Sequence, residues 1–197
     1  MRLVLASGNA GKVAELRQLL EGSAIDLVPQ TTLGVGDADE TGLTFVENAL
    51  IKARHAARAT GLPALADDSG LCVDALGGAP GLYAARYAGV HGDNAANNAK
   101  LLRELDGVPM SRRGAYFIAV LVVLRHADDP APLIAEGCWH GRVLEAPRGT
   151  AGFGYDPLFL PDGSDLGAAE LDTALKNRIS HRGQALAALQ ARLNELA

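Results

Sequence analysis

The chain has 197 residues, 48% of them hydrophobic, which is enough to bury a core as one domain over residues 1–197. Its 18 Lys and Arg residues are outnumbered by 23 Asp and Glu residues, giving a formal net charge of -5 at pH 7. This balance argues against nucleic acid and anionic membranes as partners, so a polyphosphate ligand needs a local cationic pocket. The first apolar run, Leu3 to Ala6, is too short for a signal peptide or a membrane span, and we expect a cytoplasmic protein.

Strand-like and helix-like segments alternate along the first third of the chain, which favours an α/β fold over an all-α or all-β one. Apolar spacing, capping residues and glycines set the expected boundaries. The elements predicted there are a buried strand over 3–5, a helix over 13–20 ended by Gly22, a helix from a capping box at Thr44 to about Thr60, and a strand over 63–66.

The rest of the chain predicts one more helix, a long hairpin and a final helix. Cys72 and Cys138 lie in apolar surroundings without a second ligand at metal spacing, so we expect reduced core thiols. The predicted elements are a helix capped by Asp93 through Leu105, strands 115–125 and 132–139 joined by a turn at Asp128-Asp129-Pro130, and a helix from Gly183 with Leu186, Leu189, Leu193 and Leu196 on one face.

Two adjacent carboxylates, Asp67 and Asp68, follow the apolar strand 63–66. An aspartate at the end of a buried strand costs several kcal/mol unless it is paired or binds a cation. Open α/β sheets also bind their ligands at the carboxyl ends of strands. The pair therefore indicates a metal or general-base site, and the alternative is an Asx-type turn that closes the strand.

The loop from Ser7 to Lys12 contains two glycines and ends in a lysine at the start of a helix. Glycines let backbone N–H groups approach oxyanions, and a helix N-terminus favours negative charge, so this loop is typical of a phosphate cradle. It is not a Walker A motif, because two residues instead of four separate Gly8 from Gly11-Lys12. The alternative is a glycine-rich turn with a solvated lysine.

Two further charged residues fit a site for phosphates and a cation. Lys52 lies on the second predicted helix, where it could meet phosphates, whereas Arg54, His55 and Arg58 suggest an exposed basic face. Glu40 follows Asp37 and Asp39 in a glycine-rich loop. Carboxylates beside bound phosphates suit Mg²⁺, which prefers oxygen ligands; a solvated acidic loop is the alternative.

Near the C-terminus the segment Gly152-Phe153-Gly154-Tyr155-Asp156-Pro157 places an aromatic ring between two glycines. Such a ring could stack on a planar ligand, although Tyr155 could instead belong to the core. His181 and Arg182 follow Lys176 and could donate to base carbonyl oxygens, unless they are merely surface residues.

Taken together, seven motifs occur in order over nearly the whole chain, and with them the sequence resembles the inosine/xanthosine triphosphate pyrophosphatases. The motifs are Ser7-Gly8-Asn9-x-x-Lys12, Glu40-Thr41-Gly42, Phe45-x-Glu47-Asn48-Ala49-x-x-Lys52-Ala53, Ala66-Asp67-Asp68-Ser69-Gly70, Gly78-Ala79-Pro80-Gly81, Gly152-Phe153-Gly154-Tyr155-Asp156-Pro157 and Ser180-His181-Arg182.

The resemblance implies an elongated central mixed sheet flanked by helices, with a cleft between two lobes, and a homodimer. It implies Mg²⁺-dependent hydrolysis of ITP, dITP, XTP and dXTP to the monophosphate and pyrophosphate. By position, Asp68 becomes the general base, and Glu40 and Asp68 bind the metal. The implied substrate contacts are Ser7, Gly8, Asn9, Ala10, Gly11, Lys12, Lys52, Ser69, Phe153, Gly154, Tyr155, Asp156, Lys176, His181 and Arg182.

One segment departs from the family pattern. The residues before Lys176 read Leu171-Asp172-Thr173-Ala174-Leu175 and lack the Pro-Glu-Glu sequence associated with the family, so the start of a helix there is open. Two other functions are also open: a nucleotide-binding regulator without hydrolysis, and a pyrophosphatase for another nucleotide such as a modified pyrimidine triphosphate. The retained Asp67, Asp68 and Glu40 disfavour the regulator, since binding alone does not require them.

Overall fold

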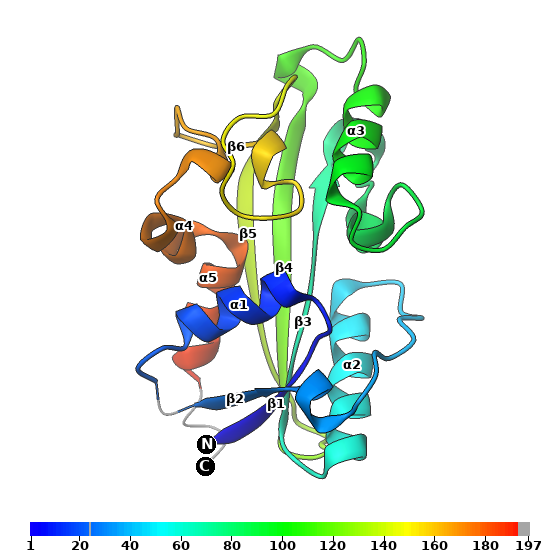
Figure 1. The fold of residues 1–197 in the computed structure, drawn as a ribbon, viewed down its shortest axis with the longest axis vertical. Coiled ribbons are helices and arrows are strands. Elements are labelled where there is room, and N and C mark those ends of the chain that lie inside the picture. The colour runs from blue at the N-terminus through cyan, green and yellow to red at the C-terminus, as the bar shows by residue number, and fades with distance from the viewer. Residues whose placement is uncertain (24, 193–197) are drawn as a thin grey trace. The chain divides into compact units, whose positions relative to one another are not determined.

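The computed structural model describes residues 1–23 and 25–192 of the chain. Figure 1 labels its strands and α-helices in chain order. They are β1 (Arg2–Ala6), α1 (Ala10–Leu19), β2 (Asp26–Pro29), α2 (Phe45–Thr60), β3 (Ala64–Val73), α3 (Asn94–Glu104), β4 (Gly114–Leu124), β5 (Leu133–Val143), β6 (Phe159–Pro161), α4 (Thr173–Ile179) and α5 (His181–Gln190). Short 3₁₀ helices occupy Gln30–Leu33, Asp74–Leu76, Gly81–Arg86, Met110–Arg112, Asp156–Leu158 and Ala168–Glu170.

The described strands form one mixed sheet in the order β2-β1-β3-β4-β5-β6. β1 pairs in parallel with both β2 and β3, whereas β6 pairs antiparallel to β5. The parallel register of β1 with β3 ends at the pair Ala6–Ala66. The α/β class and the mixed sheet predicted from the sequence are confirmed, while the elongated shape and the cleft between two lobes stay predictions.

The chain divides into two compact units. The first contains Met1–Asp68, Ala119–Gly137 and the chain from Arg182 onward, and the second contains Ser69–Ile118 and Cys138–His181. The prediction of a single catalytic domain over 1–197 is not decided by this division. Within the described residues, no helix is long and apolar enough to cross a membrane.

In the first unit, the core lies between the sheet and the two helices α1 and α5. Leu3 and Leu5 of β1 and Leu65 of β3 pack there against Leu16 of α1 and Leu186 of α5. Side chains alternate between the two faces of a strand, so the residues between these leucines face the opposite side. On that side α2 packs against β1 and buries small residues, namely Ala49, Ala53, Ala56 and Ala57.

The second unit has its own core, which is rich in aromatic residues. Phe117 of β4 lies 4.7 Å from Phe159 and 6.4 Å from Trp139 between ring centroids. Leu101 and Leu105, at the end of α3, are fully buried against the same cluster. Neither cysteine forms a disulfide; Cys72 is buried, as predicted for a core thiol, whereas Cys138 is half-buried.

Most predicted elements are confirmed, and the main differences concern β3, two short strands and the last helix. The strand predicted over 63–66 continues to Val73, so the aspartate pair lies within β3 and not at its end. β2 and β6 were not predicted, because each has only three or four residues and is defined by its pairing. The last helix begins at His181, two residues earlier than expected, and Leu193 and Leu196 lie outside the described residues.

Candidate active site

The loop between β1 and α1 is shaped by its own side chains. Asn9 is the N-cap of α1 and its Oδ1 accepts a hydrogen bond from the backbone N–H of Lys12 at 3.1 Å. The hydroxyl of Ser7 accepts from the N–H of Asn9 at 3.2 Å. These bonds fix the N-terminus of α1. A helix N-terminus favours an anion, because its first N–H groups have no partner within the helix.

Gly8 is required in this loop by a close approach. A carboxylate oxygen of Asp37 lies 2.6 Å from the position that a Cβ at residue 8 would take. Asp37 is held there by the Nε2 of Gln30, which donates to its Oδ1 at 2.7 Å. The acidic loop that carries Glu40 therefore packs directly on the predicted phosphate loop.

The two aspartates of β3 point to opposite faces of the strand. Asp67 follows Leu65 on the face covered by α1 and α5, and Asp68 follows Ala66 on the face covered by α2. Their partners agree with this alternation: Asp67 binds Lys12 of α1, and Asp68 binds Lys52 of α2. The Asx-turn alternative is wrong, because both residues continue the strand.

Asp67 is fully buried between two cations. Its Oδ1 lies 2.9 Å from the Nζ of Lys12, and its Oδ2 accepts from the Nε of Arg182 at 2.6 Å. Burial works to raise the pKa of Asp67, but the charges of Arg182 and Lys12 outweigh it and hold that pKa well below its usual range. Lys12 is thus a paired residue with a side chain only 15% exposed, which rules out the solvated lysine.

Asp68 shares one ammonium group with Glu40. The Nζ of Lys52 lies 2.5 Å from Asp68 Oδ1 and 3.0 Å from Glu40 Oε1, and it also donates to the backbone carbonyl of Asp67 at 2.9 Å. Burial raises the pKa of Asp68 above its ordinary value, although Lys52 acts in the opposite direction. A carboxylate that is buried and oriented by a hydrogen bond is suited to accept a proton.

The loop that carries Glu40 is fixed by α2. The Oδ1 of the buried Asn48 accepts from the N–H of Gly42 at 2.8 Å, and Glu47 accepts from the N–H of Leu43 at 2.9 Å. Thr44 caps the helix through the N–H of Glu47, as the capping box predicted. The acidic segment is therefore anchored to the helix that also presents Lys52.

Glu40 and Asp68 have the chemistry that Mg²⁺ requires. Both direct a carboxylate oxygen at the same cation, the ammonium of Lys52, so two oxygens already converge on one positive charge. Within residues 1–23 and 25–192, no three His, Cys, Asp or Glu side chains form a metal cluster. Since Mg²⁺ is commonly held by one or two carboxylates together with substrate phosphates, the pair fits this ion without a third protein ligand.

In the second unit, the predicted substrate residues gather around Asp156. Its Oδ2 accepts from the Nζ of Lys176 and from the backbone N–H of Phe153, both at 2.8 Å. Gly152 has a φ of 77°, and a Cβ at this position would clash with the Oδ2 of Asp156, so no other residue fits there. The Nζ of Lys176 lies 5.6 Å from the centroid of the Phe153 ring.

The other predicted substrate residues of the second unit pack against, or hydrogen-bond to, the protein around them. The ring of His181 stacks on Phe117, with centroids 4.8 Å apart and an interplanar angle of 11°. Tyr155 is buried and its hydroxyl donates to the carbonyl of Ala84 at 2.8 Å, which confirms the core alternative for its side chain. Ser69 is half-buried on β3, and Gly154 accepts through its carbonyl from Asn98 at 3.0 Å.

The segment before Lys176 forms a regular helix despite its unusual sequence. Asp172 is the N-cap of α4 and accepts from the N–H groups of Ala174 and Leu175 at 2.9 and 3.2 Å. An aspartate N-cap serves as well as any residue at this position. The departure from the family pattern therefore leaves Lys176 on a helix.

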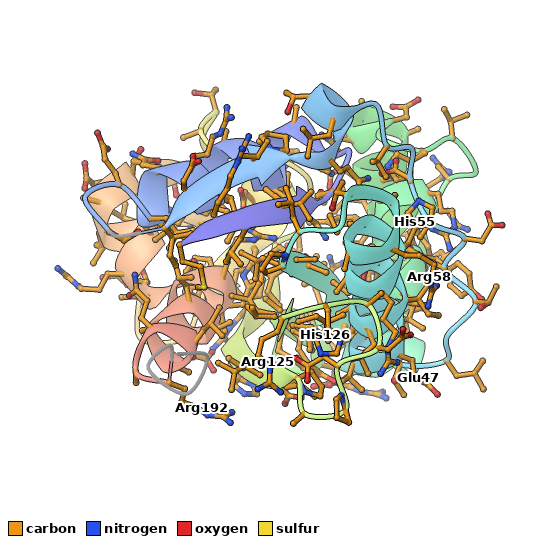
Figure 2. All side chains as sticks on the ribbon, turned by 90° about the horizontal axis from the view of Figure 1, so that it is seen from below. Glu47, His55, Arg58, Arg125, His126 and Arg192 are labelled. Atoms are coloured by element: carbon orange, nitrogen blue, oxygen red, sulfur yellow. The ribbon has the colours of Figure 1, made fainter. Side chains whose placement is uncertain are left out.

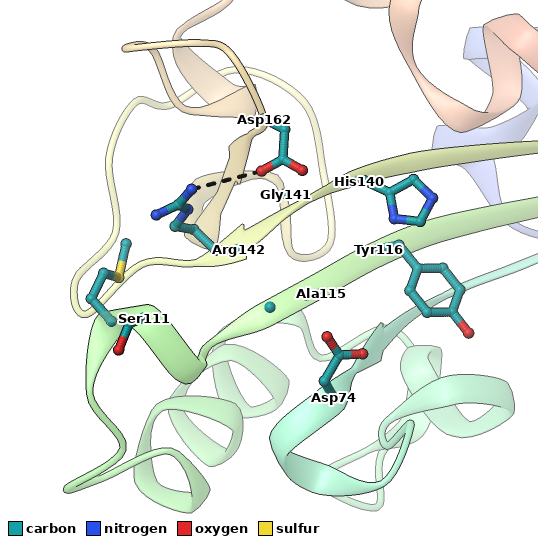
Figure 3. Close-up of a pocket in the computed structure, with 10 residues that line it drawn as sticks. Asp74, Ser111, Ala115, Tyr116, His140, Gly141, Arg142 and Asp162 are labelled. Atoms are coloured by element: carbon teal, nitrogen blue, oxygen red, sulfur yellow. Dashed lines mark ion pairs between the residues drawn. The ribbon is translucent and has the colours of Figure 1, made fainter.

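Two other regions with polar side chains were not assigned to the site, one in each unit. Figure 2 labels His55 and Arg58 of α2: Arg58 is exposed and pairs with Asp128 at 3.5 Å, whereas His55 contacts the carbonyl of Gly36 at 3.0 Å. In the second unit, a hollow of about 420 Å³ has none of the predicted site residues in its lining (Figure 3). Its lining consists of Asp74, Met110, Ser111, Gly114, Ala115, Tyr116, His140, Gly141, Arg142 and Asp162.

One charged residue in contact with the site was missed by the sequence reasoning. Glu15 of α1 forms an ion pair through its Oε2 with the Nη1 of Arg182. A signal was present, because Glu15 is three residues after Lys12 and so lies on the same face of the helix. The sequence contains no local sign of its partner, which is 167 residues away.

These features define an α/β protein with a glycine-containing loop at the N-terminus of α1 beside a buried cluster of lysines and carboxylates. The model of the Ham1 family matches residues 3–192. The dITP/XTP pyrophosphatase of Xanthomonas campestris pv. campestris (strain 8004) is 66% identical over 194 residues, 98% of each chain. The solved HAM1 protein from Coxiella burnetii has a TM-score of 0.90 at 51% identity over 99% of each chain. The Staphylococcus aureus Ham1 protein has a TM-score of 0.86 at 36% identity over 100% of each chain. The chain belongs to the Ham1 family, which confirms the resemblance drawn from its motifs.

Proposed function

We propose that this chain hydrolyses deaminated purine nucleoside triphosphates, ITP, XTP and their deoxy forms, to the monophosphate and pyrophosphate. The observation that carries the proposal is the arrangement of Lys12, Lys52, Glu40 and Asp68 beside the start of α1. The similarity to relatives named dITP/XTP pyrophosphatase supports the choice of substrate. Such an enzyme removes these nucleotides from the pool before they enter DNA or RNA.

The reaction needs a water aimed at the α-phosphorus and a group that takes its proton. In our proposal Asp68 accepts that proton while the water oxygen bonds to the α-phosphorus. The bond from this phosphorus to the bridging oxygen then breaks, and pyrophosphate leaves with the bonding pair. Lys12 and Lys52 neutralise the charge that develops on the leaving group.

The lysines are held for this role by the carboxylates around them. Lys52 orients the oxygen of Asp68 at 2.5 Å, and Lys12 is fixed against Asp67 at 2.9 Å. The charges of Asp68 and Glu40 outweigh burial and raise the pKa of Lys52, which keeps it cationic at neutral pH. The N-terminus of α1 adds backbone N–H groups at Ala10 and Gly11 for phosphate oxygens.

Magnesium is the proposed cofactor, with Glu40 and Asp68 as its protein ligands. When bound, it supplies charge neutralisation on the phosphate oxygens. The carboxylate oxygens of Glu40 and Asp68 now pair with the ammonium of Lys52. A metal bound by these oxygens would therefore compete with Lys52 for them.

Selection of the base is proposed to use Phe153, Lys176, His181 and Arg182. Inosine and xanthine present O6 as an acceptor, whereas adenine presents an amino donor that cannot pair with a cationic donor. A mismatched donor leaves buried polar groups unpaired, which is costly. Guanine also carries O6, so its 2-amino group must be rejected by the shape of the pocket.

The assembly and location are also proposals. The family resemblance supports a cytoplasmic homodimer with a single catalytic domain per chain. Sedimentation equilibrium of the purified protein is expected to give twice the monomer mass of 20.4 kDa. A monomer at all protein concentrations would refute the dimer.

A pyrophosphate-release assay over a nucleotide panel tests the function. We expect release from ITP and XTP far above that from ATP, GTP and the pyrimidine triphosphates. Equal binding of the nucleotides without release would favour the regulator. Release confined to a modified pyrimidine triphosphate would instead favour a pyrophosphatase for that nucleotide.

Removal of the metal gives the first prediction. Excess EDTA should abolish pyrophosphate release, and added Mg²⁺ should restore it. Circular dichroism should be unchanged by EDTA, because the proposed ligands form no structural cage. Full turnover in EDTA would remove the metal from the mechanism.

A further inference from the structure

The loop that carries Phe153 is held from outside by α3. The Nδ2 of Asn98 donates to the backbone carbonyl of Gly154 at 3.0 Å, across 56 residues of sequence. Because a carbonyl oxygen can only accept, Nδ2 must be the end of the amide that faces it. The hydrogen bond therefore fixes the peptide group that joins Gly154 to Tyr155.

The helix α3 is a firm support for this hydrogen bond. Leu101 of α3 is fully buried in the aromatic core of the second unit. The buried Asn97 ties the helix to the segment before it, since its Oδ1 accepts from the N–H of Ala88 at 2.7 Å and its Nδ2 donates to the carbonyl of Ala85 at 3.3 Å. Asn98 thus donates from a fixed position.

The other end of the amide indicates why asparagine occupies position 98. Among the described residues, the Oδ1 of Asn98 has no hydrogen-bond partner, and this atom is buried. A buried acceptor without a partner lowers stability by at least as much as a neutral hydrogen bond raises it. Asparagine therefore gives the fold little stability beyond that of an apolar side chain of similar size, such as leucine. Its effect is on the position of Gly154.

Gly154 lies in a turn that benefits from an outside contact. Its φ of 63° lies in the left-handed region, and glycine has many other conformations open to it. Within the turn, the carboxylate of Asp156 accepts from the N–H of Phe153 at 2.8 Å, and the N–H of Asp156 donates to the carbonyl of Phe153 at 3.3 Å. These two bonds close the turn on itself, whereas Asn98 and the hydroxyl of Tyr155 bind the turn to the rest of the unit.

We propose that Asn98 is a positioning residue that acts through Gly154 and presents the ring of Phe153 to the base of the nucleotide. The site residues assigned above do not include it. The inference rests on the proposed function, because it presumes that Phe153 stacks on the base. A turn that is ordered before binding loses less entropy when the nucleotide binds, so Asn98 should lower KM and leave the chemical step unchanged.

The test is steady-state kinetics of Asn98→Leu with ITP and XTP. We expect KM to rise about three- to tenfold, the range of one neutral hydrogen bond, while kcat changes by less than about twofold. The midpoint of urea unfolding should stay close to that of the wild type, because the variant removes an unpaired acceptor together with the hydrogen bond. Asn94→Leu is the matched control, since it makes the same change at an exposed position of α3.

Binding of the two products separates the base from the phosphates. Inosine monophosphate carries the base, whereas pyrophosphate does not. Calorimetry should show that Asn98→Leu binds the monophosphate more weakly by the same factor and binds pyrophosphate as the wild type does. In a Phe153→Ala background, Asn98→Leu should raise KM no further.

The outcomes distinguish this inference from the proposed function. An unchanged KM in the folded variant, equal losses in binding of both products, or an undiminished effect of Asn98→Leu in the Phe153→Ala background would overturn the positioning role. Should Asn98→Leu fail to fold, Asn98→Ala is measured in the same way, since alanine suits a helix and also lacks the donor. A wild-type protein that releases pyrophosphate from neither ITP nor XTP would instead overturn the proposed function, and the inference with it.

Discussion

The two groups of predicted substrate residues differ in how they are built. In the first unit, Lys12, Lys52, Asp67 and Asp68 form ion pairs at 2.5 to 2.9 Å. In the second unit, Asp156 and Lys176 form a buried ion pair, and the ring of His181 is stacked on Phe117. The first group therefore consists mainly of ion pairs, whereas the second combines a single ion pair named here with a stacked imidazole ring.

Under the proposed function, the first group acts on the triphosphate, and the second group together with Arg182 recognises the base. A triphosphate requires cations that are already in position. Here carboxylates hold the lysines in place, and phosphate oxygens could replace those carboxylates as partners. A base requires flat surfaces and a few donors in fixed directions. Variants of the first group should therefore change the chemical step, whereas variants of Arg182 and of the second group should change recognition or stability.

The largest effect is expected for Asp68→Asn. Asparagine cannot take the proton of the attacking water, so hydrolysis should fall by about 10²–10⁴-fold. The fold should be retained, because the amide oxygen can still accept from Lys52. Activity is measured by pyrophosphate release, with Asp39→Asn in the exposed acidic loop as the control. A variant that kept more than about a tenth of the wild-type rate would show that Asp68 is not the base.

A smaller effect, on selectivity, is expected for Arg182→Lys. Lysine keeps the charge between Asp67 and Glu15 but lacks the planar fork. The ITP:ATP ratio of kcat/KM should fall about ten- to a hundredfold, more than the rate with ITP itself. The measurement is kcat/KM for ITP, XTP, GTP and ATP. A uniform fall for all four nucleotides would make Arg182 a phosphate-side or structural residue.

Asp156→Ala should affect binding of the base and stability more than the chemical step. It leaves the buried Lys176 without this carboxylate and removes the acceptor for the N–H of Phe153. We expect a loss of about 3–5 kcal/mol in the free energy of unfolding and a raised KM with a smaller change in kcat. Urea unfolding and steady-state kinetics measure both, with the exposed Asp165→Ala as the control. A large fall in kcat at unchanged KM would contradict the division between the two groups.

The smallest effect on activity is expected for Asp129→Ala, in the turn between β4 and β5. Asp129 accepts from the backbone N–H groups of Arg125 and Ala131 and from the guanidinium of Arg125. The variant should lose about 1–3 kcal/mol of stability and keep its kinetic constants. A changed ITP:ATP ratio in this variant would show that selectivity is sensitive to general destabilisation.

Arg125 also determines how this turn responds to pH. Its hydrogen bonds hold the pKa of Asp129 below the ordinary value. The contribution of Asp129 to stability is therefore present at neutral pH and is lost as the pH falls through the lowered pKa. Thermal unfolding of wild type and Asp129→Ala should converge in strong acid.

Local signals were sufficient for much of the fold. The caps Thr44 and Asp93 and the apolar periodicity predicted α2 and α3 closely, because these features act within one or two turns. The extension of β3 through Asp67 and Asp68 could not be predicted in this way. Two charged residues normally end a strand, and only distant partners such as Arg182, 115 residues away from Asp67, make them tolerable inside one.

The site was predicted in part for the same reason. The loop from Ser7 to Lys12 and the aspartate pair are continuous in sequence, so their residue types alone indicate phosphate and cation chemistry. Which aspartate pairs with which lysine depends on the faces of β3, and this requires the sheet. The contact of Glu15 with Arg182 depends on α1 and α5 covering the same face, which no spacing within either helix reveals.

The position of the two aspartates inside a strand makes the chain intolerant of changes in register. One residue inserted or deleted in β3 before Asp67 would turn every later side chain to the opposite face. The first aspartate would then point to the face of Lys52 and the second to the face of Lys12 and Arg182, so the present ion pairs could not both form. Two chemically identical residues are therefore not interchangeable here, and the count of residues from Ala64 to Asp68 is as much a part of the site as the carboxylates themselves.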